Sequence, residues 1–585
     1  MSVESSITRY DEVAYPSYTH AQTHPDQLAT KATLFGMTPT PVERCRVLEL
    51  GCGDGTNLAS MALGLPHSEF VGIDLAATAI AQGQEMARAV GLNNLSLRAG
   101  SIMDLGADFG QFDYLIAHGL YSWVPEAVRE KILAICQANL APQGVAYISY
   151  NAKPGGHIKQ MFREMMLFHT KGFADPKERV HQSIALVKFL AESQTKVESY
   201  RRLLQDELEQ LLLRNENNIF HDELGEVNAA FFFHDFCEDA RRHGLQYLAE
   251  GDYVQMRDHN YPPPVREALR QLGKNRVARE QYLDFLSGRR FRQTLLCRAE
   301  LPLRFGFSPD MAARFHVACM ARPVSSKPDL ASDAPERFVG DKDANMEVSL
   351  PLAKAALAVL AEIWPRTLPF PELLAQARAR LGRPPVGELT QPGTAPDFSL
   401  SLRGTSGERA GERGDAGVRR PSSPRPSPPS EGGEGVHPLA PGAVPRCAPS
   451  ELADPETLAV FEMFVEIYAP GLATLHLSPP KFAQSVSERP LASPLARWLA
   501  RTTGHLPNLC HVPVTLEHAS GRHLLTLLDG TRDRAAIVRE MRAFIETNCH
   551  DSTGEAQPAV PSDAELESNL ANTLEVFARC ALLMA

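Results

Sequence analysis

The stretch VLELGCGDGTNL, residues 47–58, places an apolar run directly before three glycines and an acid. The spacing is Gly51-x-Gly53-x-Gly55. Glycine has no Cβ and accepts positive φ, so such a turn after a buried strand lets the backbone approach a ligand closely. The alternative interpretation of the same residues is a tight strand-to-helix turn that binds no ligand. The spacing differs from the GxGxxG of many dinucleotide binders, and the chain has no GxxxxGK[ST] phosphate loop.

Alternating apolar runs and amphipathic stretches extend on both sides of this turn, from residue 46 to residue 150. Such a rhythm is typical of a parallel sheet covered by helices, and helical patterns at 77–90 and 126–140 lie between the apolar runs. The runs expected to form strands are RVLEL (46–50), EFVGID (69–74), LSLRA (95–99), FDYLIAH (112–118) and GVAYISY (144–150). The sequence therefore predicts an α/β fold.

The segment 156–230 breaks this rhythm, because its long helical patterns have no strands between them, and we interpret it as a helical insertion. The rhythm resumes at 233–253 with a helix, a glycine stop and a strand. A further apolar run at 292–301 is able to close the sheet. Residues 386–448 are rich in Gly, Pro, Ser and Arg, and we expect disorder there because little apolar surface is available to offset the ordering entropy.

Size and composition bound the function. At 585 residues the chain should form about three or four domains. A net charge of −11 does not favour nucleic-acid binding. Residues 1–20 contain neither the basic segment nor the apolar segment of a secretory signal peptide. No apolar run approaches the roughly 20 residues that span a bilayer, so we expect a cytoplasmic protein without membrane insertion. Ten cysteines without CxxC spacing favour reduced thiols over disulfides or zinc.

An acid follows the second expected strand. This strand ends in GID, which places Asp74 nineteen residues beyond Gly55. A carboxylate at this point can accept hydrogen bonds from both hydroxyls of a ribose. The alternative is that Asp74 only caps the helix that starts near Ala76, because Asp is a favoured residue at helix starts. The residues by themselves leave both interpretations open.

The segments VLELGCGDGTNL (47–58) and VGIDL (71–75) resemble motifs I and II of the class I S-adenosylmethionine-dependent methyltransferases. The resemblance implies a Rossmann-like sheet of seven strands, including a late pair near residues 245 and 295. It also implies S-adenosylmethionine as the cofactor. The implied cofactor-binding residues are Glu49, Gly51, Gly53, Asp54, Gly55, Asp74, Leu75, Ser101, Ile102 and His118.

Within that resemblance, Glu49 and the glycine backbone would border the methionine moiety, and Asp74 would bind the ribose hydroxyls. The family's next acid contacts the adenine amino group, but this chain has AGSIMDL at 99–105, with Ser101 where the acid is expected. Either Ser101 or Asp104 would then take the adenine contact, and Ile102 would pack on the base.

A closer resemblance covers about residues 1–300. It is to bacterial methyltransferases that carry a methyltransferase regulatory domain, a subfamily that includes rickettsial protein-lysine methyltransferases acting on an outer-membrane protein. The matching segments are 10–37, HGLYSWVP at 118–125, SYNAKPGG at 149–156, and 218–250. This resemblance implies a lysine side chain of a protein as the methyl acceptor.

Methyl transfer from a sulfonium needs no metal, but it needs alignment, desolvation and a deprotonated acceptor. We expect the catalytic groups to be Tyr18, His118, Tyr121 and Tyr150, which lie in the N-terminal segment or after expected strands. The alternative for each tyrosine is amphipathic packing, and for His118 a hydrogen bond within its loop. The cluster His221, Asp222, Glu223 and His234 lacks HExxH spacing, so we expect no metal site there.

The sequence thus predicts a methyltransferase acting on protein lysine. The alternatives are a small-molecule methyltransferase and a cofactor-binding regulatory or interaction protein; a homodimer is an open option. The expected parts are a lid segment (1–40), the cofactor-binding core (41–155), the helical insertion (156–230), a regulatory region completing the sheet (231–300), a helical accessory region (301–385), a linker (386–448) and a C-terminal helical domain (449–585). In the last part, 522–545 favours an ordinary helical hairpin over a winged-helix-like module.

Overall fold

The computed structural model describes residues 13, 15–194, 196–259, 261–340, 344–383, 401–403, 455–468, 472–548 and 561–585. The chain forms two compact units. The first comprises Met1–Asp252, Asp284–Phe305 and His476–Ala585, and the second comprises Tyr253–Leu283 and Gly306–Leu475. The expected linker, 386–448, lies outside the described residues except for 401–403.

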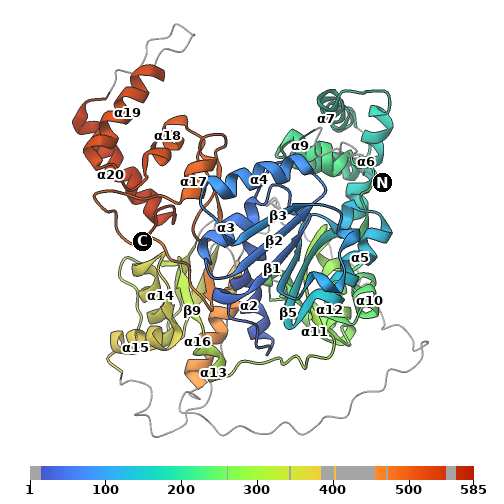
Figure 1. Cartoon of the computed structure of the whole chain (residues 1–585). Coiled ribbons are helices and arrows are strands. Elements are labelled where there is room, and N and C mark those ends of the chain that lie inside the picture. The colour runs from blue at the N-terminus through green and yellow to red at the C-terminus, as the bar shows by residue number, and fades with distance from the viewer. Residues whose placement is uncertain are drawn as a thin grey trace. The chain divides into compact units, whose positions relative to one another are not determined.

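The first unit is built on an eight-stranded sheet with the order β3-β2-β1-β4-β5-β8-β7, and the short β6 lies beside β5 (Figure 1). Its strands are β1 (Arg46–Leu50), β2 (Glu69–Asp74), β3 (Leu95–Ala99), β4 (Phe112–Ala117), β5 (Leu140–Ala152), β6 (Ala230–Phe231), β7 (Leu245–Glu250) and β8 (Phe291–Arg298). The strands β1–β5 run parallel, whereas β8 is antiparallel to β5 and to β7. The seven strands of the path from β3 to β7 are those expected of the class I methyltransferase fold, and the two-residue β6 is an eighth strand that the sequence did not predict.

The position of the glycine turn follows from this topology. The central strand β1 is buried from Val47 onward, because strands lie on both sides of it and helices cover its faces. Since β1 and β2 are parallel and in register, they end at the same edge of the sheet, at Leu50 and Asp74. Ligands of open α/β sheets bind at this carboxyl edge.

Local residues explain where the helix after the glycine turn begins. The first helix after the glycine turn begins at Thr56, whose amide donates to the carboxylate of Asp54 over 3.0 Å. Its N-cap, Gly55, is in the left-handed region. The helices of this part are α2 (Pro25–Leu34), α3 (Thr56–Gly64), α4 (Ala77–Ala89), α5 (Glu126–Asn139) and α10 (Phe233–Arg242).

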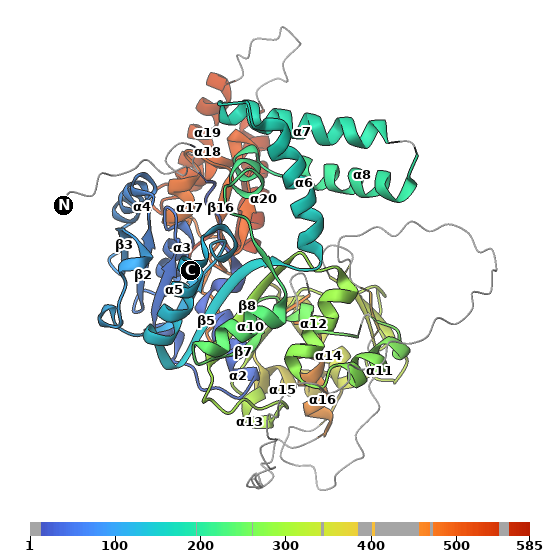
Figure 2. The ribbon, with the colours of Figure 1, turned by 90° about the vertical axis from the view of Figure 1, so that its right-hand side faces the viewer.

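The segment after β5 is helical, as expected. Figure 2 shows α7 and α8 side by side and extended away from the strands. The helices have their own apolar cluster, which includes Phe162, Val187 and Leu204. The elements are α6 (Gly155–Thr170), α7 (Pro176–Ser193), α8 (Glu198–Leu212), α9 (Glu216–Asn218) and a π-helical turn η6 (Ile219–Glu223).

The C-terminal part of the first unit holds more than the favoured helical hairpin. Its elements are α17 (Pro494–Leu499), the paired strands β16 (His505–Pro507) and β17 (Pro513–Thr515), α18 (Ala519–Leu527), α19 (Arg534–Asn548) and α20 (Asp563–Arg579). One apolar cluster joins residues of α17, α18 and α20 to Ala59 of α3 and Met86 of α4. The C-terminal part therefore shares a core with the cofactor-binding part.

The second unit mixes helices and strands, so the expected helical accessory region at 301–385 contains short strands besides its helices. Its strands are too short for a clear alternating pattern, which is why the sequence did not reveal them. Its helices are α11 (Pro263–Leu272), most of α12 (Arg276–Ser287), α13 (Pro309–Ala312), α14 (Pro351–Ile363), α15 (Phe370–Arg380) and α16 (Pro455–Glu466). Its strands are β9 (His316–Cys319), β10 (Arg322–Pro323), β11 (Glu336–Val339), β12 (Asn345–Val348), β13 (Leu368–Pro369), β14 (Ser401–Arg403) and β15 (Ala473–His476).

No helix of the described ranges is both long enough and apolar enough to cross a membrane.

Candidate functional site

Three glycines shape the turn between β1 and α3. Gly51, Gly53 and Gly55 have φ values of +72°, +57° and +74°, a region that residues with a Cβ rarely adopt. A Cβ on Gly55 would lie 2.6 Å from the side chain of Leu97, whereas a Cβ on Gly53 would meet nothing within 4 Å. Packing therefore requires the glycine at 55, and Gly53 leaves an open backbone surface that a ligand can approach.

Asp74 is tied to this turn. Its Oδ2 accepts a hydrogen bond from the amide of Gly53 over 2.8 Å, and its Oδ1 accepts one from the amide of Ala76 over 2.8 Å. The second bond is the helix-capping contact that the sequence left open. The first bond shows that capping is not the whole account, because the same carboxylate also fixes the glycine turn.

Glu49 is buried beneath the turn, with 4% of its surface exposed. Its Oε1 accepts a hydrogen bond from Nδ2 of Asn57 over 2.9 Å, while its Oε2 is buried and has no partner among the described residues. Burial raises the pKa of this carboxyl to about 8. A buried carboxyl with an unused oxygen is costly unless a ligand pairs with it, and a cation beside that oxygen would favour the ionised form. These features fit the cationic amino group of S-adenosylmethionine.

Residues after β2 and β3 lie where the adenine is expected. Leu75 directly follows Asp74 and is 64% exposed, so its side chain is free to contact a ligand. Ser101 accepts a hydrogen bond from the amide of Met103 over 3.2 Å and so starts a short 3-10 turn. Ile102 is buried, and Asp104 is exposed. Apolar side chains at Leu75 and Ile102 are suited to the two faces of a base.

His118 follows β4 at the same edge of the sheet. Its Nδ1 lies 2.9 Å from the hydroxyl of Tyr147, so the predicted alternative of a local hydrogen bond is present. Its ring stacks on the ring of His20, with 3.6 Å between the centroids. Burial, with the neighbouring His20, lowers the pKa of His118 well below its usual range. His118 is therefore neutral at physiological pH.

Two of the four expected catalytic residues lie in the core. Tyr121 is 2% exposed and packs edge-on against Phe236 of α10. Tyr150 is fully buried, stacks on Phe236 at 4.2 Å and is within hydrogen-bond distance of the Thr294 hydroxyl, at 3.1 Å. We correct the expectation for both, because α10 covers the side of the sheet toward which these rings point. Amphipathic packing, the alternative, accounts for them.

The N-terminal segment is bonded to the glycine turn and α3. Ser17 donates a hydrogen bond from its hydroxyl to the carboxylate of Asp54, and the amide of His20 donates to Oδ1 of Asn57 over 3.0 Å. Tyr18 is half-buried, and its ring meets that of His505 edge-on at 6.2 Å. The segment that the sequence places as a lid therefore contacts the residues that it is expected to cover.

Four histidines from distant parts of the chain gather beside this site. Beyond the stacked pair His20 and His118, the ring of His24 lies 5.4 Å from the ring of His511 in the C-terminal part. Burial lowers the pKa of His20 and of His24 to about 4 and that of His511 far below its usual range. The sequence analysis missed His20, His24, Asn57 and His511. Asn57 lies inside the quoted motif, but nothing in the sequence links it to residue 511.

The cluster of acidic residues and histidines for which we expect no metal site forms ion pairs and hydrogen bonds. Glu223 pairs with Lys159 over 3.0 Å and also with Arg214. His221 is bonded through Nε2 to the carbonyl of Val13 over 2.7 Å. Within the part of the chain that the structure describes, no group of three or more His, Cys, Asp or Glu side chains is arranged to hold a metal ion.

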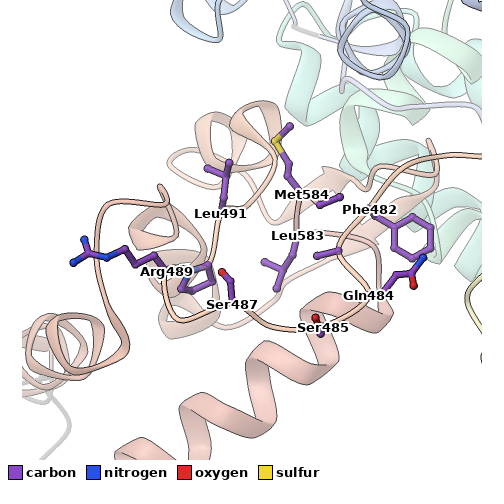
Figure 3. A pocket seen from close by; sticks show the side chains of 11 residues that line it. Phe482, Gln484, Ser485, Ser487, Arg489, Leu491, Leu583 and Met584 are labelled. Atoms are coloured by element: carbon purple, nitrogen blue, oxygen red, sulfur yellow. The ribbon is translucent and has the colours of Figure 1, made fainter.

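Two surface hollows lie outside this site. One, of about 470 Å³, lies in the C-terminal part. Figure 3 shows side chains that line it, among them Phe482, Ser485, Arg489, Leu491 and Met584. The other, of about 440 Å³, is lined by residues of the helical insertion and the loop that follows η6. None of the expected cofactor-binding residues lines either hollow. The cofactor site therefore rests on the glycine turn and its neighbours.

Comparison with known protein families matches three successive parts of the chain. A methyltransferase domain matches residues 41–211, a predicted methyltransferase regulatory domain matches 215–298, and the PKMT C-terminal winged helix domain matches 488–582. The last match covers the helices and the strand pair of the C-terminal part. A winged helix, the less favoured of the two sequence interpretations, is thus the better description of that part.

Relatives extend this likeness along the chain. An uncharacterized protein of Rickettsia prowazekii is 38% identical over 386 residues, which cover 65% of this chain and 70% of that protein. A second uncharacterized protein of the same organism is 38% identical over 240 residues, covering 41% of this chain and 96% of that protein.

Among solved structures, PKMT2 from Rickettsia typhi covers 98% of this chain and 100% of its own, with 26% identity and a TM-score of 0.76. Its complex with AdoHcy, the demethylated cofactor, gives 25% identity and a TM-score of 0.75 over the same shares. With the glycine turn, Asp74 and the unpaired oxygen of Glu49, this likeness makes S-adenosylmethionine the cofactor. The chain belongs to the family of S-adenosylmethionine-dependent methyltransferases in which a methyltransferase domain, a methyltransferase regulatory domain and a PKMT winged helix domain follow one another.

Proposed function

We propose that this methyltransferase modifies lysine side chains of a protein. The observation that carries the proposal is the match to PKMT2, a rickettsial protein-lysine methyltransferase, over 98% of the chain. A likeness confined to the cofactor-binding core would leave the acceptor open, because that core serves many acceptors. Here the likeness extends through the regulatory and winged helix domains.

We infer the following cofactor contacts. The backbone of Gly51, Gly53 and Gly55 and the carboxyl of Glu49 hold the amino-acid end, with Asp54 fixing the turn. Asp74 receives the ribose hydroxyls. The adenine lies among the side chains of Leu75, Ser101 and Ile102. The bound cofactor supplies an activated methyl group on a sulfonium.

The acceptor amine must be neutral when it attacks, because its lone pair forms the new bond. We place His118 next to the acceptor, since it lies at the carboxyl edge of β4 beside the N-terminal segment. Its pKa, well below the usual range, makes it a weak base toward an ammonium group. His118 therefore orients a neutral amine by hydrogen bonding and does not remove its proton. Tyr18, half-buried in the N-terminal segment, borders the path by which the acceptor enters.

The test is transfer of a labelled methyl group. The full chain is incubated with radiolabelled S-adenosylmethionine and a bacterial lysate that is afterwards separated into protein and small-molecule fractions. We expect label in protein, and mass spectrometry should find it as methylated lysine. An Asp74→Ala variant, which should bind the cofactor poorly, serves as the control. Label confined to small molecules would contradict the proposal.

The oligomeric state is a separate prediction. A homodimer would show in sedimentation velocity as a species of about twice the 64.2 kDa chain mass. A single species of the chain mass would rule the homodimer out.

A further inference from the structure

A loop of the winged helix domain delivers one histidine to the cofactor site. His511 has a φ of +59°, although it is not glycine, and it is 2% exposed. Oδ1 of Asn508 accepts hydrogen bonds from the amides of Cys510 and Val512, both over 2.9 Å, and Nδ2 of Asn508 donates to the carbonyl of Cys580 over 2.9 Å. Left-handed backbone at a residue with a Cβ costs on the order of 1 kcal/mol and persists where surrounding contacts hold it.

Both ring nitrogens of His511 reach α3. Nδ1 lies 2.9 Å from the hydroxyl of Ser60, and Nε2 lies 3.0 Å from Oδ1 of Asn57. The orientation of the Asn57 amide is fixed, because the backbone N–H of His20 donates to the same Oδ1 over 3.0 Å. That atom must be the acceptor, so Nε2 of His511 carries the proton and Nδ1 accepts from the Ser60 hydroxyl.

The other end of the Asn57 amide points to the cofactor site. Its Nδ2 donates to Oε1 of Glu49 over 2.9 Å and to the hydroxyl of Thr23 over 3.1 Å. Asn57 is 5% exposed, so water does not readily replace a lost partner. The chain of contacts therefore runs from His511 through Asn57 to Glu49, whose second oxygen is buried without a partner among the described residues.

We propose that His511 is a positioning residue for cofactor binding, through which the winged helix domain holds Asn57 and thereby sets the carboxyl of Glu49 toward the amino group of the cofactor. This inference rests on the proposed role of Glu49 and is independent of which acceptor is methylated. Without the Nε2–H donor, Oδ1 of Asn57 keeps the His20 amide as its one short hydrogen-bond donor, so the amide is held less firmly. The carboxyl of Glu49, which Nδ2 of Asn57 holds, is then positioned less firmly as well.

Two ligands separate this role from a merely structural one. AdoHcy carries the amino-acid end that Glu49 is proposed to bind, whereas 5′-methylthioadenosine has the same nucleoside and lacks that end. We expect His511→Ala to weaken AdoHcy binding by about tenfold, the effect of losing about 1.4 kcal/mol, as for one hydrogen bond. Binding of 5′-methylthioadenosine should not change. Calorimetric titration of the full chain measures both.

Matched variants sharpen the test. His511→Gln places an amide N–H near the position of Nε2 and should restore AdoHcy binding. His511→Asn reaches only the position of Nδ1 and should not. Ser60→Ala removes the Nδ1 partner without touching Asn57, and it should leave both ligands unaffected. If His511→Ala does not fold, the comparison of the Gln and Asn variants carries the same information.

The outcomes distinguish this inference from its premise. Equal weakening of AdoHcy and 5′-methylthioadenosine in His511→Ala would reduce the histidine to a structural role and overturn the inference. If Glu49→Gln weakens AdoHcy binding and His511→Ala does not, the contact chain is refuted while the role of Glu49 stands. If Glu49→Gln changes nothing, the role of Glu49 fails first. In the double variant we expect AdoHcy to bind no more weakly than in Glu49→Gln alone.

Discussion

At the scale of single residues, the carboxyl of Glu49 ties stability to pH. Its pKa is raised from 4.5 to about 8 in the folded chain, so the folded state keeps a proton that the unfolded state loses at lower pH. The free energy of unfolding of the cofactor-free chain should therefore fall as pH rises from about 4.5 to about 8. The contribution is most favourable below the lower value and is lost by the upper one.

Glu49→Gln tests this dependence. The amide does not titrate, so the variant should lose less stability than the parent chain between pH 5.5 and pH 8. Urea denaturation at the two pH values measures the difference, and other titrating groups cancel when parent and variant are compared. An identical loss of stability in both chains would show that Glu49 does not hold its proton when folded.

Asp74→Ala addresses the ribose. We expect AdoHcy binding to weaken by about 1–3 kcal/mol, because hydroxyls that bond the carboxylate lose their partner and the Gly53 amide loses its acceptor. Asp108→Ala is a matched control, since Asp108 is exposed and is not an expected cofactor contact. Calorimetry measures both affinities. An unchanged affinity in folded Asp74→Ala, or an equal loss in Asp108→Ala, would contradict the placement of the ribose.

At the scale of elements, two glycines of the turn are needed for different reasons: Gly55 for packing and Gly53 for cofactor binding. Gly55→Ala should lower the free energy of unfolding by about 1–3 kcal/mol, because the new Cβ would lie 2.6 Å from Leu97 and the backbone is left-handed. Gly53→Ala meets no such clash, so it should cost stability only on the order of 1 kcal/mol but obstruct the cofactor. Urea denaturation and AdoHcy titration of both variants give the two quantities. The opposite ranking in stability would refute the assignment.

The regular elements of the sheet are predictable from short-range patterns. The strands β1, β2 and β3 have the bounds that the sequence predicts. For β1 and β2 the reason is burial, since buried parallel strands leave mainly apolar stretches, whereas β3 lies at the edge of the sheet and is mostly half-buried or exposed. Strand β5 begins at Leu140, four residues before the expected start, where Pro142 and Gln143 interrupt the apolar pattern. The tyrosines 121 and 150 show the limit of such patterns. A sequence marks a tyrosine as amphipathic, but it does not tell which helix will cover its side of the sheet.

The cofactor site likewise contains residues that short-range sequence patterns predict and one residue that they do not. Its glycines, Glu49 and Asp74 lie within one strand-turn-helix-strand unit, where spacing alone brings them together. His511 is 454 positions from Asn57, and no periodicity relates two side chains at that distance. A single sequence therefore predicts the residues that we propose to hold the cofactor and misses the histidine that we propose to position them.

At the scale of the whole molecule, the winged helix domain and the cofactor-binding part share one apolar cluster. Ala59 of α3 is fully buried in it, among residues of α17, α18 and α20. Because buried clusters open cooperatively, AdoHcy should slow amide hydrogen exchange in α17 and α20 as well as in α3. Mass spectrometry of exchanging peptides measures this protection.

Ala59→Asp should uncouple the two parts. A carboxylate buried in an apolar cluster without a partner costs several kcal/mol, so the C-terminal helices should exchange faster in this variant. At an AdoHcy concentration that saturates the variant, the strands β1–β4 should keep the protection that AdoHcy gives them. Unchanged exchange in α17 and α20 would show that the shared cluster does not couple the parts.

The long sequence separation between His511 and Asn57 also has a consequence for protein synthesis. A ribosome adds about 5–20 residues per second, so the partner of Asn57 follows it by roughly 20–90 s. During that interval the nascent chain already contains the strands and glycines of the cofactor site. A chain released early would carry every recognisable cofactor motif and bind its cofactor poorly. Full affinity for the cofactor is therefore expected only after residue 511 has been translated and has met Asn57.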